Sequence, residues 1–264
     1  MDLELKDKKA IITGGSRGIG KSVALSLALE GVDIGICSRF RESLSATASE
    51  IEHLTGRNVF FSPADTTNTE SVESFVNSAA TELGGIDILV NNAAAPGGLV
   101  MGPLETASAE ELLSDLDTKV VGYLRAAKAV APYMKQQGWG RIINIGGLAA
   151  RSAGAFSGMR NLALTHFTKT LSNELGPHGI TVNIIHPGAT RTERTGPMQE
   201  SQASELDLSM EEVERKAASG IDIRRLVESE EIAYLTTFLA SPKASAITGE
   251  AIAAGGGVGS AVFQ

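Results

Sequence analysis

Residues 9–29 read KAIITGGSRGIGKSVALSLAL, and this stretch decides the fold. KAIIT, at residues 9–13, is short and apolar, as buried strands are, and it leads into a glycine-rich turn, TGGSRGIG, at residues 13–20. A segment of helical character follows. Glycines allow a tight turn and a close approach of the backbone to a phosphate, and the free N–H groups that begin a helix attract an anion. The stretch therefore predicts a strand–turn–helix unit that binds a dinucleotide.

Short apolar runs alternate with longer segments of helical period along nearly the whole chain. This alternation is typical of a parallel sheet covered by helices on both faces. The expected strands are residues 9–13, 33–38, 59–62, 86–90, 141–145, 181–185 and 250–253. The expected helices are residues 18–30, 41–55, 69–83, 108–136, 157–175 and 228–240. We therefore expect an α/β fold of the Rossmann type: one domain over residues 1–264, with a doubly wound, seven-stranded parallel sheet.

One region breaks the regular alternation. From Gly188 to Leu226 prolines, glycines and many charged residues connect the sixth strand to the next regular helix, with one short amphipathic segment at 210–218. Insertions of this length in compact domains are commonly functional. We expect residues 190–226 to form a lid over a substrate.

Composition narrows the class of protein. The chain has 264 residues, of which 42% are hydrophobic, and no apolar run approaches the length of about 18 residues that spans a bilayer. The formal net charge of −8 repels phosphate backbones, so we expect small molecules or proteins, not nucleic acid, as partners. Residues 1–10, MDLELKDKKA, lack the apolar region of a secretory signal, which favours a cytoplasmic location. Cys37 is the single cysteine, and no cluster has metal-ligand spacing, so neither a disulfide nor a metal is expected.

Five motifs, in order and at matching spacing, resemble those of the short-chain dehydrogenase/reductase family. They are TGGSRGIG at 13–20, Asp65 after the third strand, NNAA at 91–94, Pro187-Gly188 followed by Thr192, and the pairs at 248–249 and 255–256. The resemblance covers essentially the whole chain. It implies that a nicotinamide dinucleotide contacts Gly14, Ser16, Arg17, Gly18, Ile19, Gly20, Ser38, Arg39, Asp65, Thr66, Asn91, Ala93, Pro187, Gly188, Thr190 and Thr192.

The charges after the second strand indicate which dinucleotide binds. An NAD site needs an acidic residue there for the ribose hydroxyls, but the sequence reads Ser38-Arg39-Phe40-Arg41. Arg39, together with Arg17, would instead pair with a 2′-phosphate, for which a guanidinium is well suited. A competing interpretation is that Arg39 and Arg41 are only solvated residues at a helix start. We expect NADP(H), with NAD less favoured.

The resemblance also implies a divergent catalytic centre. The family uses a Tyr as acid or base, a Lys that lowers the pKa of the Tyr, a Ser that orients the substrate and an Asn that holds a water. Alignment on the neighbouring motifs places Ser157, Asn161, Gly147 and Lys119, respectively, at those positions. A shift of two residues in the helix at 108–136 would put Asp117, not Lys119, at the Asn position.

Other residues are candidates to replace the missing groups. Lys119 could act as an acid or an electrostatic clamp, and Arg160 or Arg151 could hold a carboxylate or a developing oxyanion. Ser157 and Asn161 remain neutral hydrogen-bonding groups beside the cofactor. In the competing interpretations Lys119 points to solvent, Arg160 packs between subunits and Arg151 lies on the surface. His186 is a further candidate to approach the nicotinamide.

These features favour an NADP(H)-dependent oxidoreductase that transfers hydride between NADP and a small carbonyl, alcohol or activated C=C compound. Reduction of a C=C bond suits the centre better than reduction of a ketone, because an enolate oxygen needs a fixed cation more than a strong acid. The alternatives are an NADP-binding protein without redox turnover, such as a sensor or inactive partner subunit, and an isomerase or cyclase. Relatives commonly form tetramers through the helices at 108–136 and 157–175, which implies a homo-oligomer, a tetramer or a dimer.

Overall fold

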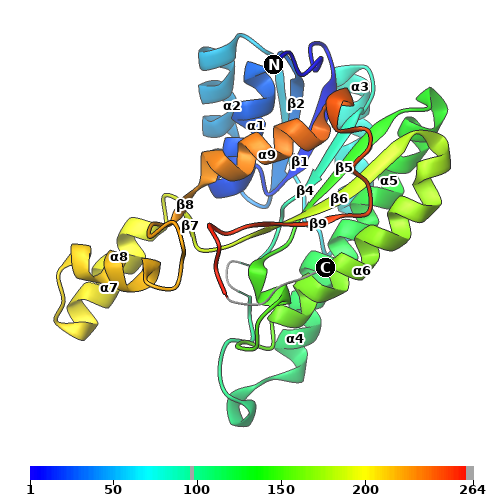
Figure 1. The fold of residues 1–264 in the computed structure, drawn as a ribbon. Helices are drawn as coiled ribbons and strands as arrows, with labels where there is room; N and C mark the ends of the chain where they lie inside the picture. Colours follow the sequence, from blue (N-terminus) through cyan, green and yellow to red (C-terminus); the bar gives the residue numbers. More distant parts are fainter. Residues whose placement is uncertain (96–97, 260–264) are drawn as a thin grey trace.

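The main sheet is parallel in the computed structural model, which describes residues 1–95 and 98–259 (Figure 1). Seven strands lie in the order β3-β2-β1-β4-β5-β6-β9, which confirms the predicted seven-stranded parallel sheet. Their bounds are β1 Lys9–Thr13, β2 Asp33–Ser38, β3 Val59–Pro63, β4 Ile88–Asn91, β5 Gly140–Ile145, β6 Ile180–Pro187 and β9 Ala251–Ala254.

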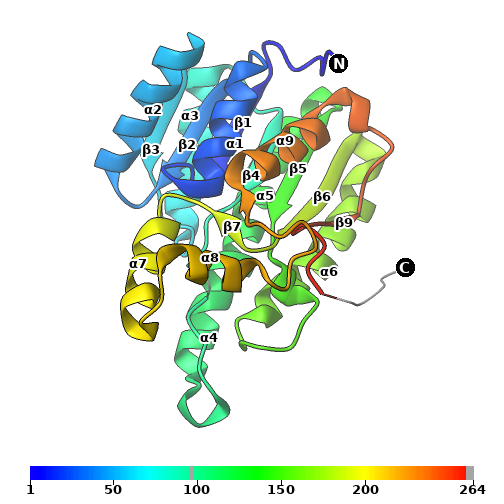
Figure 2. The same cartoon turned by 60° about the vertical axis from the view of Figure 1, so that its left-hand side comes forward.

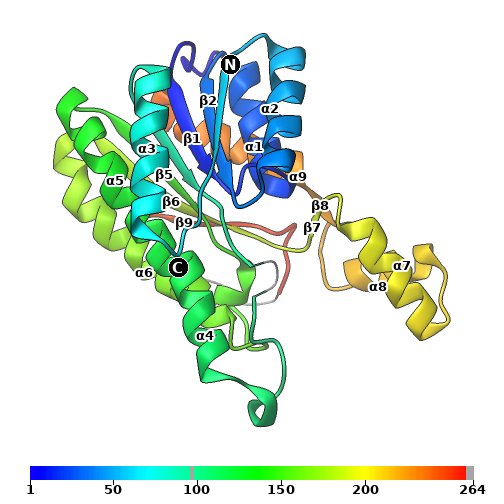
Figure 3. The same cartoon turned by 180° about the vertical axis from the view of Figure 1, so that it is seen from behind.

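Helices cover both faces of the sheet (Figures 1 and 3). One face carries α1 (Gly18–Leu29), α2 (Arg41–Thr55) and α9 (Ser229–Ala240), and the other carries α3 (Thr69–Leu83), α5 (Gly122–Gln137) and α6 (Gly158–Leu175). Neighbouring side chains in a strand point to opposite faces, so Ile12 packs under α1 and Ile11 under α3. Within the described ranges, no helix combines the length and the apolar character that a bilayer crossing requires.

The order of the strands reverses between β1 and β4. The connections that leave the carboxyl ends of these two neighbouring strands run to opposite faces of the sheet, which opens a crevice between them. Ligands of open α/β sheets bind at such a switch point. The sheet therefore places the loop after Thr13 beside the loop after Asn91, and both contain predicted cofactor residues.

The helix expected at 108–136 is interrupted. It consists of α4 (Ala109–Leu116), one π-helical turn, η2 (Asp117–Val121), and α5. Single π-turns inside longer helices are uncommon and occur frequently at functional sites. Gly122 lets the helix pass close to Thr66, because a Cβ at 122 would lie 2.9 Å from the Cβ of Thr66. Lys119 lies in the middle of this π-turn.

The insertion after β6 is more regular than the sequence suggests. The expected amphipathic segment is α8 (Met210–Ala218), which begins with a capping box formed by Ser209 and Glu212. A further helix, α7 (Thr195–Leu206), was not predicted, because Gly196 and Pro197 lie in its first turn and it has no clear apolar face. Two short strands, β7 (Thr190–Arg191) and β8 (Val227–Glu228), join the insertion to the body. The pair α7–α8 and α4 both project from the body (Figure 2).

Candidate functional site

The two loops at the switch point are tied together by hydrogen bonds. The backbone N–H groups of Asn92 and Ala93 donate to Thr13 Oγ1 at 3.0 and 3.1 Å, and Asn92 Nδ2 donates to the carbonyls of Thr13 and Gly14. Gly14 has φ +67°, and a Cβ there would lie 2.9 Å from Ala93 Cα. Only glycine fits this close approach without strain. Asn92 thus holds the glycine-rich loop in place; it belongs to the NNAA motif but is not among the predicted contact residues.

A carboxylate lies at the start of α1. The N–H of Gly18 donates to Glu193 Oε1 at 2.9 Å and to Oε2 at 3.2 Å. Arg17, the N-cap residue, provides no side-chain cap, and the first turn has no acidic residue. Glu193 therefore supplies the negative charge that a helix N-terminus attracts, at the place where a dinucleotide phosphate is expected. The signal that could have found it is its position directly after Thr192 in the PG-x3-T motif.

Positive charge gathers at the carboxyl end of β2. The guanidinium of Arg39 lies 5.7 Å from the ring centre of Phe40, and Arg39 and Arg17 are both exposed. Asp65 accepts hydrogen bonds from the N–H and hydroxyl of Thr67, which lower its pKa, and the charge of Arg39 contributes to the same shift. Two exposed guanidiniums on this rim suit a phosphate monoester.

The other predicted cofactor residues divide into two groups. Asn91 is fully buried, and its side chain donates to Asn144 Oδ1 at 3.0 Å, inside the sheet. Thr66 is buried as well and donates to the carbonyl of Thr118 in η2. The side chains of Asn91 and Thr66 are thus engaged inside the protein, and the predicted cofactor contacts of these two residues stay predictions for their backbone groups. The remaining predicted residues lie on the loops after β1, β2, β3, β4 and β6, namely Ser16, Ile19, Gly20, Ser38, Asp65, Ala93, Pro187, Gly188, Thr190 and Thr192.

Lys119 points into the molecule and meets Asn161. Its Nζ donates to Asn161 Oδ1 at 2.9 Å and to the carbonyl of Gly146 at 2.8 Å, and the residue is 3% exposed. Asp117, the alternative at this position, faces the other way and pairs with Arg125 at 2.8 Å. The π-turn, α6 and the loop after β5 therefore bring Lys119, Asn161 and the peptide at 146–147 into one centre.

The surroundings change the acidity of Lys119. Burial disfavours the charged ammonium and lowers its pKa to about 7, and the positive charge of Arg160 adds to this shift. The negative charge of Asp115 opposes it. Near neutral pH both forms of the side chain are therefore populated. Such a group can donate a proton or place a positive charge beside a reacting atom.

Arg160 is engaged in a buried ion pair. Its Nη1 contacts Asp115 Oδ1, and its Nη2 donates to the carbonyl of Ala95 at 3.0 Å. Asp115 is fully buried and Arg160 is 5% exposed. The expected role of Arg160 in holding a substrate anion does not fit this arrangement, nor does packing between subunits. Asp115 was missed in the sequence because it reads as one more acidic residue on an exposed helix.

Ser157 is bound to the loop that precedes α4. Its hydroxyl accepts from the N–H of Val100 at 2.9 Å, and its own N–H donates to the carbonyl of Val100 at 3.2 Å. Gly98, with φ +104°, packs directly on Ser157, since a Cβ at 98 would lie 2.2 Å from the Cβ of Ser157. The backbone of this loop thus fills the space that a longer side chain at 157 would need.

Residues 14–259 match the sequence family described as enoyl-(acyl carrier protein) reductase. The chain belongs to the short-chain dehydrogenase/reductase family. It is 33% identical over 258 residues to the NADPH-dependent reductase BacG of Bacillus subtilis, covering 96% of this chain and 98% of BacG. It is 34% identical over 263 residues to the 3-oxoacyl-[acyl-carrier-protein] reductase FabG of Vibrio cholerae, covering 97% and 99%. Among solved structures, L-sorbose reductase from Gluconobacter frateurii complexed with NADPH and L-sorbose has a TM-score of 0.93 at 29% identity, covering 98% of each chain.

The remaining candidates in this short-chain dehydrogenase/reductase lie beside the centre. Arg151 follows β5 and donates to the carbonyl of Ala251 at 2.8 Å, so it fixes that loop to β9. His186, near the end of β6, is 1% exposed and accepts a hydrogen bond from the N–H of Gly147, so its ring is packed inside the protein. In residues 1–95 and 98–259 no group of three His, Cys, Asp or Glu side chains is placed to hold a metal.

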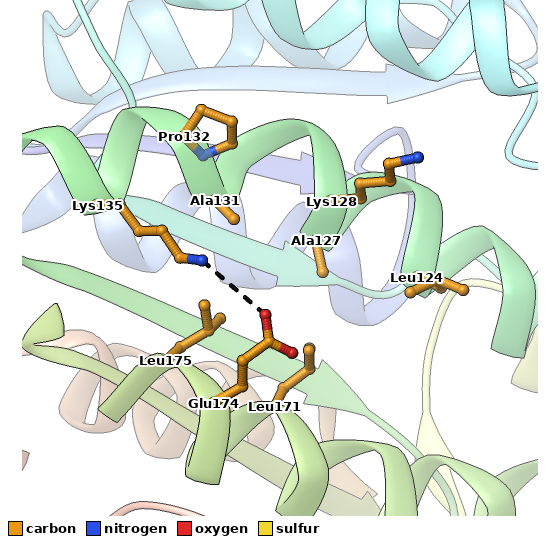
Figure 4. A pocket seen from close by; sticks show the side chains of 9 residues that line it. All are labelled: Leu124, Ala127, Lys128, Ala131, Pro132, Lys135, Leu171, Glu174 and Leu175. Atoms are coloured by element: carbon orange, nitrogen blue, oxygen red, sulfur yellow. Dashed lines mark ion pairs between the residues drawn. The ribbon is translucent and has the colours of Figure 1, made fainter. Parts of the chain in front are cut away.

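A groove of about 450 Å³ lies between α5 and α6 of this reductase fold (Figure 4). Its lining is largely apolar, and Lys135 and Glu174 face each other across it at 3.9 Å. The lining residues are Leu124, Ala127, Lys128, Ala131, Pro132, Lys135, Leu171, Glu174 and Leu175. A second hollow of about 350 Å³ lies at the start of α1 and includes Gly18, Thr192 and Glu193. The second hollow, not the groove, adjoins the predicted cofactor site.

Proposed function

We propose that this protein is an NADPH-dependent reductase that acts on a carbon–carbon double bond conjugated to a carbonyl group. In this proposal Lys119 stabilises the negative charge that develops on the carbonyl oxygen. The observation that carries the proposal is the direct hydrogen bond between the buried Lys119 ammonium and Asn161. That contact places a cation in the centre by means of side chains that differ from the family's usual set.

The cofactor is NADP(H). The glycine-rich loop and the N-terminus of α1 suit a pyrophosphate, and Arg39 and Arg17 suit a 2′-phosphate. BacG is named as NADPH-dependent, and L-sorbose reductase was solved with NADPH. Bound NADPH supplies the hydride in this family's chemistry.

The catalytic centre reads as an exchange of two residues. By the family's motifs, Asn161 stands where a lysine is usual and Lys119 stands where an asparagine is usual. The two side chains are hydrogen-bonded at 2.9 Å. The exchange therefore keeps a positive charge in the centre and shifts it only from position 161 to the neighbouring position 119. Ser157 and Gly147 stand where a tyrosine and a serine are usual, and neither supplies a comparable acid.

This arrangement favours conjugate addition over reduction of an isolated ketone. A free tyrosine has a pKa of about 10 and can protonate an alkoxide, whereas a serine hydroxyl cannot take over that task. Hydride addition to the β-carbon shifts the π electron pair toward the carbonyl, and the product is an enolate. A fixed cation stabilises the enolate oxygen, and a proton from Lys119 or water completes the α-carbon. The family description, enoyl-(acyl carrier protein) reductase, names this type of reaction.

The test is a panel of substrates followed by NADPH absorbance. We expect conjugated enones, enals or enoyl thioesters to be reduced, and the matching saturated ketones to react at least about 10²-fold more slowly, as the loss of a positioned acid predicts. If NADPH binds but no compound in the panel is reduced, the proposal fails and a protein without redox turnover is supported.

Variants of Lys119 test the assigned role. Lys119→Met should abolish turnover of the best enone, and Lys119→Arg should keep part of it because the positive charge remains. Lys6→Met, which removes an exposed lysine far from the centre, is the control and should leave the rate unchanged. Full activity of Lys119→Met would remove this residue from the mechanism.

We further propose that the chain forms a homo-oligomer through α5 and α6. The groove between these helices is largely apolar, and two leucines on them, Leu124 in the groove and Leu162 elsewhere on α6, are 47% and 60% exposed. A second copy of the chain would cover them. The insertion at 190–226 is proposed as the substrate lid, since its base contacts the start of α1 through Glu193.

A further inference from the structure

The peptide group between Gly146 and Gly147 is held from both sides. Its carbonyl oxygen, on Gly146, accepts from Lys119 Nζ at 2.8 Å. Its N–H, on Gly147, donates to His186 Nδ1 at 3.1 Å. A peptide group is planar, so the direction of the N–H determines the direction of the carbonyl. The contact with His186 therefore determines where the oxygen that binds Lys119 points.

The hydrogen bonds around His186 assign its tautomer. Thr165 Oγ1 donates its single proton to the carbonyl of Asn161 at 3.1 Å. The same hydroxyl lies 3.0 Å from His186 Nε2, and it accepts there because Nδ1 of the neutral ring already accepts from the N–H of Gly147. Nε2 therefore carries the proton, and Nδ1 presents a lone pair to Gly147. The imidazole must be neutral for this chain of contacts to exist.

The packing around the ring supports the neutral form. His186 is 1% exposed, and a Cβ at Gly146 would lie 2.4 Å from Nδ1, so the ring packs directly on the peptide. Burial lowers the pKa of His186 to about 4. The positive charges of Arg151 and Lys119 act in the same direction, and the hydrogen bond from Gly147 opposes them. The lone pair on Nδ1 is thus available throughout the pH range in which Lys119 titrates.

We propose that His186 is a positioning residue for Lys119, which acts by holding the Gly146 carbonyl toward the ammonium group. The proposal rests on the role of Lys119 put forward above. His186 touches neither the expected cofactor nor the substrate, and its effect is transmitted through one peptide group. Loss of the acceptor at Nδ1 would free the peptide to turn, and Lys119 would lose a charged hydrogen bond.

Two amide substitutions distinguish the contribution of Nδ1 from that of Nε2. In His186→Asn the amide oxygen can take the place of Nδ1 and accept from Gly147. In His186→Gln the longer side chain brings its amide near Nε2 and leaves the Gly147 N–H without an acceptor. We expect kcat for His186→Gln to fall about tenfold, the size of one lost hydrogen bond to a charged group, while His186→Asn stays within about threefold of the parent. His166→Gln, at an exposed histidine of α6, is the control.

A second measurement does not depend on turnover. In the full chain labelled with ¹³C-lysine, the Cε signal of Lys119, identified by its absence in Lys119→Met, reports the pKa of this side chain by NMR. We expect His186→Gln to lower that pKa by about one unit, because the charged form loses an acceptor, and His186→Asn to leave it near the parent value. Equal pKa values in all three proteins would overturn the inference even if Lys119 proves essential.

The two readouts also distinguish the two proposals. If Lys119→Met is fully active and His186→Gln still lowers the pKa of Lys119, then His186 positions a lysine that has no part in the reaction. The proposed function is then wrong, while the positioning role of His186 stands. If both amide variants lose activity equally with unchanged titration, the effect of His186 is one of general stability, and the positioning role is wrong.

Discussion

Lys119 and Asn161 lie 42 positions apart in the sequence and meet at 2.9 Å in the buried centre. Lys119 forms no ion pair among the described residues; the second hydrogen bond of its ammonium is to the Gly146 carbonyl. The ammonium is therefore oriented by two neutral oxygens. A cation held in this way keeps its charge available for a substrate oxygen.

The first prediction concerns pH. Burial lowers the pKa of Lys119 to about 7, and the proposed role requires the charged form. We expect kcat/KM to be constant below that pH and to fall tenfold per unit above it. A rate profile between pH 5.5 and 9 checks this, with Lys119→Arg as the comparison, since a guanidinium stays charged and should give a flat profile. A flat profile in the parent would contradict the role of Lys119.

The same shift affects stability. The unfolded chain keeps Lys119 protonated up to about pH 10.4, so between pH 7 and 10 it binds more protons at this site than the folded chain does. The contribution of Lys119 to the free energy of unfolding therefore rises with pH over that interval and is lost as pH falls through about 7. Urea unfolding of the parent and of Lys119→Met at pH 6.5 and 9 isolates this term. An identical pH dependence in both proteins would show that folding does not lower the pKa of Lys119.

The second prediction concerns the choice of cofactor. Arg39→Asp removes a guanidinium from the rim of the β2 end and adds a carboxylate that suits free ribose hydroxyls. We expect KM for NADPH to rise about 10- to 100-fold, the size of one to two charged hydrogen bonds, and the preference to move toward NADH. Arg41→Gln should have a smaller effect, because Arg41 is placed over the ring of Phe61 at 5.4 Å. An unchanged ratio of the two KM values in Arg39→Asp would remove Arg39 from the phosphate site.

The third prediction concerns the carboxylate at the start of α1. Glu193 accepts the hydrogen bond of the Gly18 N–H, to which a pyrophosphate would otherwise bind, and its negative charge would repel the pyrophosphate. Glu193→Gln should therefore tighten binding of NADPH about three- to tenfold, as judged from the energy of a charge at a helix terminus. Fluorescence titration at two salt concentrations checks it, since the difference should shrink as salt screens the repulsion. Glu200→Gln, on exposed α7, is the control, and an equal gain there would indicate a general effect of net charge.

The fourth prediction concerns stability at the buried ion pair. Arg160→Met leaves the carboxylate of Asp115 buried without its partner, which should cost about 3–5 kcal/mol of the free energy of unfolding. The double variant Arg160→Met with Asp115→Leu should recover most of this loss, because no charge is left unpaired. Lys135→Met, which breaks the exposed pair with Glu174, should cost less than about 1 kcal/mol. Denaturant unfolding followed by circular dichroism measures all three, and a small effect of Arg160→Met alone would show that the pair is hydrated.

The fifth prediction concerns assembly. Leu124→Glu places a charge on the largely apolar groove between α5 and α6 and should convert an oligomer into a smaller species. Light scattering after gel filtration gives the mass. Leu54→Glu, at a leucine on α2 that is also about half exposed, should leave the mass unchanged. A monomeric parent would rule out the proposed interface directly.

Local patterns in the sequence were sufficient for the architecture. The run KAIIT and the glycine turn after it predicted β1, the loop and α1, because short apolar runs and glycine spacing act on neighbouring residues. The interruption of the helix at 117–121 could not be predicted, since no glycine or proline within that stretch marks the π-turn. The helix at 195–206 was missed because Gly196 and Pro197 disguise its first turn.

The sequence by itself determined which segments form strands and helices, where the cofactor loops lie along the chain, and that positive charge follows β2. All of these depend on residues close together along the chain. Only the tertiary structure decided that Lys119 points inward while Asp117 points outward. It also decided that Asp115 forms an ion pair with Arg160, and that Glu193 hydrogen-bonds to Gly18, 175 positions away in the sequence. These outcomes depend on how helices pack and where burial leaves a charge without water. No spacing in the sequence encodes them, because the free energy of each contact arises from groups that meet only after folding.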